Sequence, residues 1–280
     1  MWWAITLGVL GGIVVTIALS IVTGGITFKR KVDSEVEKLL EQSKGLKPKV
    51  VTEEDIRGLP EPVQRYLRYS QAIGKEKTRT VRLKQKGTLR QREGQKWMPF
   101  EAEQYYTTEP PGFIWYATAK AGPLWVKARD MFYDGKGNML IKLLSLIKIA
   151  DASGPEMDQG ALIRYLNEAM WFPTAYLSDY IKWEPLNSNS AKATMSVKGM
   201  TASATLYFNE KGEVTNFVAE RYAMEGGKFA LRTWSTPIQG YREINGVRIP
   251  NKGYAAWNLS SGEFKYIELE ITDIEYDGLR

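Results

Sequence analysis

The first 28 residues, Met1 to Phe28, contain no charged side chain, and Lys29-Arg30-Lys31 follow directly. About 20 apolar residues are enough to cross the hydrocarbon core of a bilayer. Trp2 and Trp3 stand where an interfacial aromatic belt is expected. This stretch predicts a single transmembrane helix over residues 1–28, which would hold the rest of the chain at a cell membrane.

A cleaved signal peptide is the alternative interpretation of the same stretch. Signal peptides combine a basic start, an apolar core of roughly 7–15 residues and a small-x-small cleavage site. Here no basic residue precedes the apolar run, and the run continues beyond the candidate triplet Ala18-Leu19-Ser20. A retained anchor is therefore favoured. Because the basic residues lie only downstream, the positive-inside rule favours a cytoplasmic domain, with an extracytoplasmic one left open.

The chain contains neither cysteine nor histidine. Disulfides, thiolate or imidazole metal sites, Ser-His-Asp triads and Cys-His dyads are therefore excluded. Catalysis would have to use carboxylates, Lys, Tyr or Arg. The lack of a recognised catalytic motif favours a binding protein over an enzyme, with catalysis left open, and no cofactor is expected.

The remaining residues divide into a connecting segment, 29–51, and one β-rich domain, 52–280. A juxtamembrane helix is expected over residues 32–44, where Ser34 and Glu37 form a capping box. A linker around Pro48 follows, and a short helix over 61–69 begins at a proline-rich turn.

From residue 78 the apolar pattern alternates with a period of two, which is typical of strands. The predicted strands are 79–92, 97–107, 113–119, 126–133, 139–149, 181–184, 192–198, 202–209, 214–224, 228–236, 241–244, 247–249, 254–259 and 263–276. One helix, residues 159–170 within a helical insertion near 159–178, interrupts them after a turn over 151–158. The expected fold is mostly β: a large curved antiparallel sheet, a half-barrel or open barrel, with the insertion on its concave face.

A basic stripe marks the first predicted strand, where charged and apolar side chains alternate and so point to opposite faces. Residues 65–96 hold 11 basic and 2 acidic side chains. The stripe is either a solvated edge strand or a surface that meets anionic lipid headgroups. Its residues, assigned to the membrane surface, are Arg82, Lys84, Lys86, Arg90 and Arg92.

The chain is also rich in aromatic residues, with nine Trp and fifteen Tyr. These residues either form an ordinary core or line a cavity for a lipid-like ligand. In the helical insertion, Arg164, Glu168 and Trp171 have the spacing of neighbours on one helix side. They form either a surface ion pair with an aromatic cover or an anion clamp at a pocket mouth. The residues expected to bind the ligand are Arg164, Glu168, Trp171, Arg221, Tyr222, Trp234, Arg248 and Trp257.

Two other site types are compatible with the carboxylates. Glu101 and Glu103 share a strand face at a separation near that of glycosidase pairs, so with Glu168 they are candidates for a hydrolase of envelope glycans. A group in the turn, Asp151, Glu156 and Asp158, could hold a hard cation but does not match an EF-hand, so we expect no metal site.

Several motifs resemble those of an uncharacterised family of bacterial membrane-anchored proteins of unknown function. They are LPEPVQRYL at 59–67, RYLNEAMWFPTA at 164–175, Arg221-Tyr222, and GVRIP at 246–250 with Trp257. The likeness spans residues 59–276 and implies no catalytic roles. The layout also resembles the half-barrel of lipoprotein carriers, which implies a lipid cavity and a location outside the cytoplasm.

Together these observations predict a membrane-anchored domain that binds a hydrophobic or amphiphilic ligand without catalysis. Its partners would be membrane lipid and a lipid-like small molecule, with no nucleic acid, and the oligomeric state is left open. The alternatives are the hydrolase and a structural or interaction module of a membrane complex, which would present a flat apolar patch.

Overall fold

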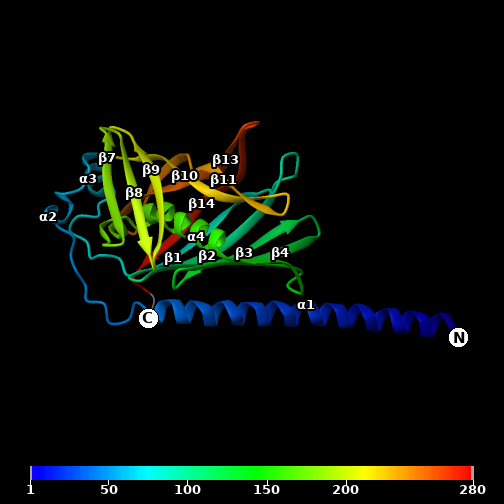
Figure 1. Cartoon of the computed structure of the whole chain (residues 1–280). Helices are drawn as coiled ribbons and strands as arrows, with labels where there is room; N and C mark the ends of the chain where they lie inside the picture. The colour runs from blue at the N-terminus through cyan, green and yellow to red at the C-terminus, as the bar shows by residue number, and fades with distance from the viewer. Residues whose placement is uncertain (1, 279–280) are drawn as a thin grey trace.

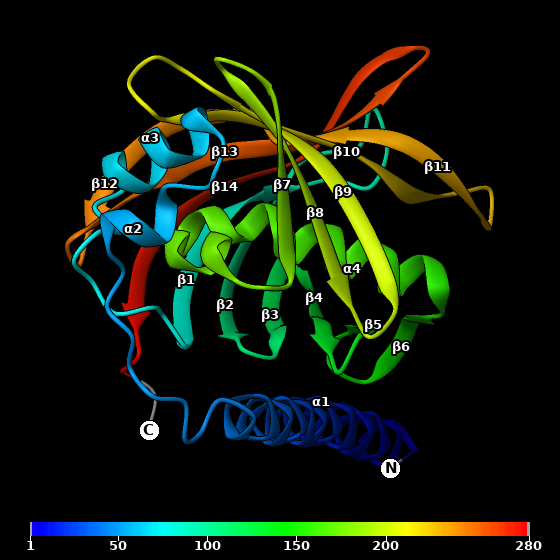
Figure 2. The ribbon, with the colours of Figure 1, turned by 60° about the vertical axis from the view of Figure 1, so that its left-hand side comes forward.

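The computed structural model describes residues 2–278 and is dominated by one curled antiparallel sheet (Figure 1). Thirteen strands are hydrogen-bonded in the order β6-β5-β4-β3-β2-β1-β14-β13-β11-β10-β9-β8-β7, and β12 pairs with β13. The sheet wraps around α4, which runs through the concave side (Figure 2). The predicted half-barrel with a central helical insertion is therefore confirmed.

Alternating apolar residues generate most of the strands, as the period-two pattern predicts. The strands are β1 Thr80–Leu89, β2 Met98–Thr108, β3 Pro111–Ala121, β4 Leu124–Tyr133, β5 Lys136–Leu143, β6 Ile147–Ser153, β7 Ile181–Asn187, β8 Ser190–Val197, β9 Met200–Phe208, β10 Val214–Glu225, β11 Lys228–Ser235, β12 Ile238–Ile244, β13 Val247–Leu259 and β14 Gly262–Tyr276. The helices are α1 Trp2–Glu41, α2 Glu53–Ile56, α3 Glu61–Tyr69 and α4 Pro155–Glu168, followed by the 3-10 turns η1 Ala169–Trp171 and η2 Pro173–Leu177.

Three predicted boundaries are wrong. The single strand expected over 139–149 is two strands, because Leu144 and Ser145 take positive φ angles of 50° and 65° and reverse the chain without a glycine. The turn expected over 151–158 is instead the end of β6 and the first turn of α4. The strands expected over 247–249 and 254–259 are one strand, because β13 continues through Pro250, which pairs with Tyr241 of β12 beside a register shift where Asn251 is the extra residue.

The N-terminal segment also differs from the prediction of two separate helices. α1 continues without a break from Trp2 to Glu41. It includes a stretch long and apolar enough to span a membrane, a property that a signal sequence shares. Its C-terminal part lies on the convex face of the sheet (Figure 2).

The docked part of α1 forms a second hydrophobic cluster, outside the half-barrel. Phe28, Val32, Val36 and Leu39 recur at helical spacing and are buried against side chains of β2, β3, β4 and β5. Strand β3 is therefore covered on both faces, by α4 inside the half-barrel and by α1 outside it. For this reason every residue from Pro111 to Trp115 is buried.

Candidate functional site

Arg164 and Glu168 lie one turn apart on α4 and face the inner side of the sheet. The Arg164 guanidinium donates from Nε to Glu168 Oε1 at 2.8 Å and from Nη1 to Asp130 Oδ2 on β4 at 2.7 Å. The predicted Arg164–Glu168 contact is present, but it is largely buried: the side chains of Glu168 and Asp130 are 7% and 5% exposed. The surface ion pair considered from the sequence is therefore wrong.

The second oxygen of Glu168 also has internal partners. Glu168 Oε2 accepts hydrogen bonds from Tyr106 Oη at 2.9 Å and from Gln104 Nε2 at 2.8 Å. Burial raises the pKa of the Glu168 carboxyl, and the Arg164 charge and these hydrogen bonds oppose the rise. Both carboxylate oxygens are thus committed to holding the concave face together.

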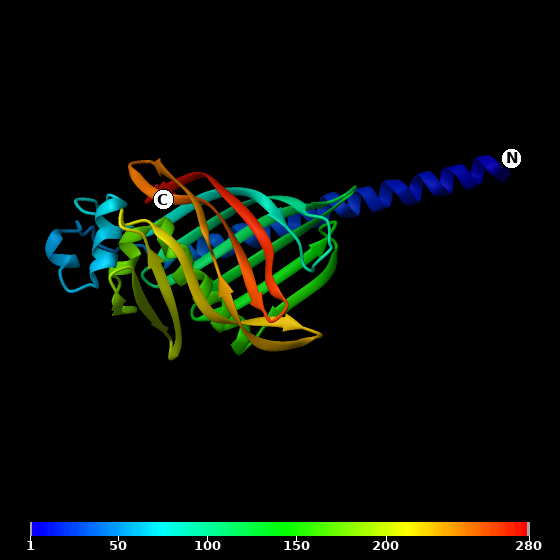
Figure 3. The ribbon, with the colours of Figure 1, turned by 90° about the horizontal axis from the view of Figure 1, so that it is seen from above.

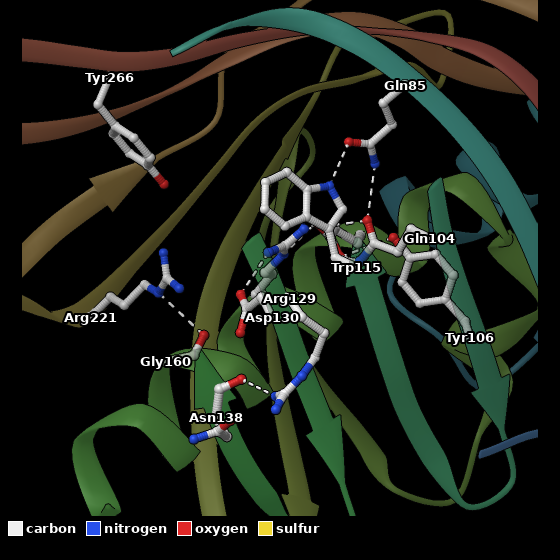
Figure 4. Close-up of polar contacts among 12 residues, drawn as sticks. Gln85, Gln104, Tyr106, Trp115, Arg129, Asp130, Asn138, Gly160, Arg221 and Tyr266 are labelled. Atoms are coloured by element: carbon white, nitrogen blue, oxygen red, sulfur yellow. Dashed lines mark hydrogen bonds and ion pairs between the residues drawn. The ribbon is translucent and has the colours of Figure 1, made fainter. Parts of the chain in front are cut away.

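Aromatic rings and amides extend these contacts across the inner sheet (Figure 4). Trp115 Nε1 donates to Gln85 Oε1 at 3.2 Å, and Gln85 Nε2 donates to Gln104 Oε1 at 3.0 Å. The rings of Phe113 and Trp115 lie 5.0 and 5.1 Å from the Arg164 guanidinium carbon. We call this set the buried polar network; its members are Gln85, Gln104, Tyr106, Trp115, Asp130, Arg164 and Glu168.

Trp171 does not cover Arg164 as predicted. The α-helix ends at Glu168, and the tighter 3-10 turn that follows directs the Trp171 indole to the carbonyl of Pro250 at 3.0 Å. The expected helical spacing fails because the helix stops before reaching this residue.

The buried polar network is not fully closed. The Arg164 side chain remains 16% exposed, and Asp130 Oδ1 is buried without a hydrogen-bond partner among the described residues. A buried carboxylate oxygen without a partner is costly. Two carboxyl groups already contact the one guanidinium, so Arg164 has no free hydrogen-bonding face to offer an anion.

Arg221 on β10 lies across from this network and has different surroundings (Figure 4). Its Nε donates to the carbonyl of Gly160 on α4 at 3.2 Å. The rings of Trp234 and Trp257 lie 4.9 and 5.9 Å from its guanidinium carbon. Within residues 2–278 no carboxylate forms an ion pair with Arg221, which is only half-buried.

The aromatic side chains around Arg221 hold one another in place. Trp234 Nε1 donates to Tyr266 Oη at 3.0 Å, and Tyr266 stacks on Trp257 with ring centroids 6.0 Å apart. Gly160 permits the approach of α4, because a Cβ there would lie 3.3 Å from Arg221 Nε. Arg221, Trp234, Trp257 and Tyr266 are called the arginine–aromatic cluster below.

The other two predicted ligand residues lie elsewhere. Tyr222 follows Arg221 in a strand and therefore points to the outer face, where it is exposed. Arg248 lies over the Tyr69 ring at 4.9 Å and pairs with Glu243 at 3.4 Å, beside α3. The eight predicted residues thus divide among separate places rather than forming one pocket.

The basic stripe lies on the outer face of β1, as the alternation predicts, but acidic neighbours neutralise part of it. Arg82 pairs with Glu103 on β2 and with Glu275 on β14, and Lys86 lies 3.7 Å from Glu270. Lys84 is exposed, Arg90 lies over the rings of Trp97 and Phe264 at 4.6 and 5.2 Å, and Arg92 is exposed in the β1–β2 turn.

The hydrolase candidates do not share a face of the sheet. Glu101 and Glu103 point outward, whereas Glu168 is buried within the half-barrel, so the three carboxylates do not form one site. Glu101 lines an outer cavity of about 500 Å³, where Lys86, Lys120 and Lys252 are matched by three carboxylates, Glu101, Glu268 and Glu270.

Two of the three acidic residues considered for a cation, Asp151 and Asp158, have separate basic partners. Asp158 accepts from the Gly137 amide at 2.8 Å and from Lys136 at 2.9 Å, while Asp151 pairs with Lys148 at 3.3 Å. Across residues 2–278, no group of three His, Cys, Asp or Glu side chains is arranged to hold a metal ion.

Sequence reasoning missed the strand residues that complete the site, above all Asp130 and Tyr266. Asp130 carried a usable signal, because Arg129-Asp130 interrupts an apolar strand that continues to Phe132. A charged pair within a buried strand predicts one side chain for each face, and Arg129 indeed pairs with Glu35 of α1 on the outer face. Tyr266 had no comparable signal.

Residues 49–269 match DUF6544, which is described as a family of unknown function, and the chain belongs to this family. The motifs that suggested an uncharacterised family lie within this match. No curated protein matches the sequence.

Proposed function

We propose that this protein is anchored to a membrane by α1 and binds an amphiphile with an anionic head group at the arginine–aromatic cluster. The observation that carries the proposal is Arg221: a half-buried guanidinium, covered by two indole rings, with no carboxylate partner within residues 2–278. Guanidinium groups removed from water normally have a counter-charge. A phosphate or carboxylate head would supply it through a bidentate contact.

The surrounding aromatic rings support an apolar tail. Trp257 and Tyr266 are partly exposed on the inner side of the sheet, while Trp234, the cross-strand partner of Trp257, is 3% exposed. Surfaces of this kind, with one charged group among aromatic rings, are typical of small-molecule sites. The sequence favoured Arg164 as the anion clamp. Two carboxylates already pair with its guanidinium, so Arg164 is better suited to holding α4 against the sheet than to binding an anion.

Native mass spectrometry of the full chain released from a nonionic detergent tests this proposal. We expect a dodecyl phosphate adduct to form in preference to one with dodecyl maltoside, which has the same tail and a neutral head. Arg221→Gln should weaken dodecyl phosphate binding about tenfold, because a charged hydrogen bond contributes roughly 1.5–3 kcal/mol.

Arg242→Gln is the matched control, since Arg242 is exposed on β12 away from the cluster. It should leave the dodecyl phosphate adduct unchanged. Equal binding by the Arg221 and Arg242 variants would contradict the proposal, as would equal binding of the two amphiphiles.

A further inference from the structure

The point at which α1 leaves the sheet is marked by two glycines. A Cβ on Gly24 would lie 2.6 Å from Leu146 Cδ2 and 3.0 Å from the Ser145 carbonyl, and Gly25 lies beside Ser145 and Lys127. The β5–β6 turn therefore touches the helix here. Before this point the described side chains of α1 are exposed, apart from the half-buried Ile21.

The free part of the helix has the length of a membrane span. Residues 2–23 extend about 33 Å at 1.5 Å per residue, and a bilayer core is about 30 Å thick. If these residues cross a bilayer, its surface falls at Gly24 and hence at the β5–β6 turn. Lys29-Arg30-Lys31 then lie beyond the surface, alongside the domain.

Several other turns reach the same end of the molecule. Figures 1 and 3 show β1 to β6 running roughly along α1, with several hairpin turns at the side from which the helix projects. These are the β1–β2, β3–β4, β5–β6, β10–β11 and β13–β14 turns. Because α1 is one continuous helix docked through Phe28 and Leu39, the direction of its span is fixed relative to them.

Exposed apolar side chains concentrate at this end. Ten large hydrophobic residues are exposed in the described chain after α1, and seven of them lie on the β3–β4, β5–β6 and β10–β11 hairpins. Those seven are Leu124, Leu146, Ile147, Ile149, Tyr222, Met224 and Leu231. Lys120, Lys148 and Lys228 lie beside them and are exposed.

We infer that these three hairpins form a rim that inserts into the interfacial layer of the bilayer spanned by α1. The inference rests on the proposed anchoring. A bilayer is the partner that fits, because the rim surrounds the exit of an apolar helix and carries lysines that suit lipid headgroups. Arg221 lies four residues from Glu225 at the β10–β11 turn, so an amphiphile can reach the arginine–aromatic cluster from the membrane.

Single-cysteine variants test the rim, because the chain has no native cysteine. The full chain would be reconstituted in phosphatidylcholine–phosphatidylglycerol nanodiscs and labelled with a nitrobenzoxadiazole dye at Leu124→Cys, Ile147→Cys or Met224→Cys. Lipid carrying a doxyl quencher at acyl carbon 5 should reduce the emission of each at least twofold. Ser188→Cys and Glu210→Cys, in exposed turns away from the rim, are controls that should remain unquenched.

Val14→Cys, in the apolar part of α1, distinguishes a failure of the rim inference from a failure of the proposed anchoring. Quenching at Val14 without quenching at the three hairpin sites would overturn the rim while leaving the anchor intact. No quenching at Val14 would overturn both. Equal quenching at the hairpin sites and at the controls would also refute the inference, because the domain would then contact lipid without a preferred end.

Discussion

At the residue scale, Arg164 and Arg221 show how the environment divides two identical side chains between different roles. Arg164 is held by Asp130 and Glu168, and these carboxylates raise its pKa against the opposing effect of burial. Arg221 has aromatic neighbours and one backbone carbonyl. The first arginine therefore organises the concave face, whereas the second has no carboxylate partner within residues 2–278.

The raised pKa of Glu168 leads to a prediction about stability and pH. Between its ordinary value near 4.5 and its higher folded value, the folded chain holds a proton that the unfolded chain has lost. The stabilisation linked to this group is complete below about pH 4.5 and is lost as the pH rises through the folded pKa. The free energy of unfolding of the native chain, minus that of Glu168→Gln, should therefore decrease as the pH is raised from 4 to 8.

Urea unfolding of the detergent-solubilised chain at a series of pH values measures this difference. Glu213→Gln is the control with the opposite sign, because the hydrogen bond from Tyr69 lowers the pKa of Glu213. The stabilisation linked to Glu213 is present above the ordinary pKa of a glutamate and is lost as the pH falls through the lowered folded pKa. A flat or rising difference for Glu168→Gln would contradict the assigned direction.

At the scale of elements, the contact between α1 and the sheet determines how the domain is oriented relative to the free part of α1. Besides its apolar stripe, α1 carries Glu35, whose Oε2 lies 3.0 Å from Nε of Arg129 on β4. Arg129 is 3% exposed and also donates to the Asn138 carbonyl at 2.9 Å. Loss of Glu35 would leave this buried guanidinium without its counter-charge.

Glu35→Gln should therefore loosen the docked half of α1. An unsatisfied buried polar group costs about 1–3 kcal/mol, and more when it is charged, and each 1.4 kcal/mol changes an equilibrium about tenfold. Tryptic cleavage after Lys38 in the full chain should accelerate at least about tenfold, because cleavage follows the population of the undocked helix.

Glu37→Gln is the matched control, since Glu37 is exposed on the same helix and forms no ion pair within residues 2–278. Combining Glu35→Gln with Arg129→Met should restore much of the protection, because the unpaired charge is then removed. If the Glu35 and Glu37 variants are cleaved at the same rate, the pair does not hold the helix.

At the scale of the whole molecule, α1 joins its free apolar segment to the segment docked on the sheet as one continuous helix. Cleavage near Ala18-Leu19-Ser20 would remove most of the free segment and leave the docked segment in place. We expect the intact mass of the membrane-extracted protein to be 31.8 kDa, with residues 2–23 retained. The protein should also remain in the membrane fraction after washing at pH 11, and a mature mass that begins near residue 21 would show a signal sequence instead.

The sequence alone determined the local features, because these follow from short-range patterns. Period-two alternation identified most strands, the uncharged run identified the apolar helix, and Arg164 and Glu168 were correctly paired from their spacing on a helix. Only the tertiary structure decided which distant residues meet. Asp130 and Tyr266 join the site through strand order and sheet curvature, and Trp171 leaves it because the helix tightens after Glu168, so the set of residues that meet depends on contacts between elements far apart in the sequence.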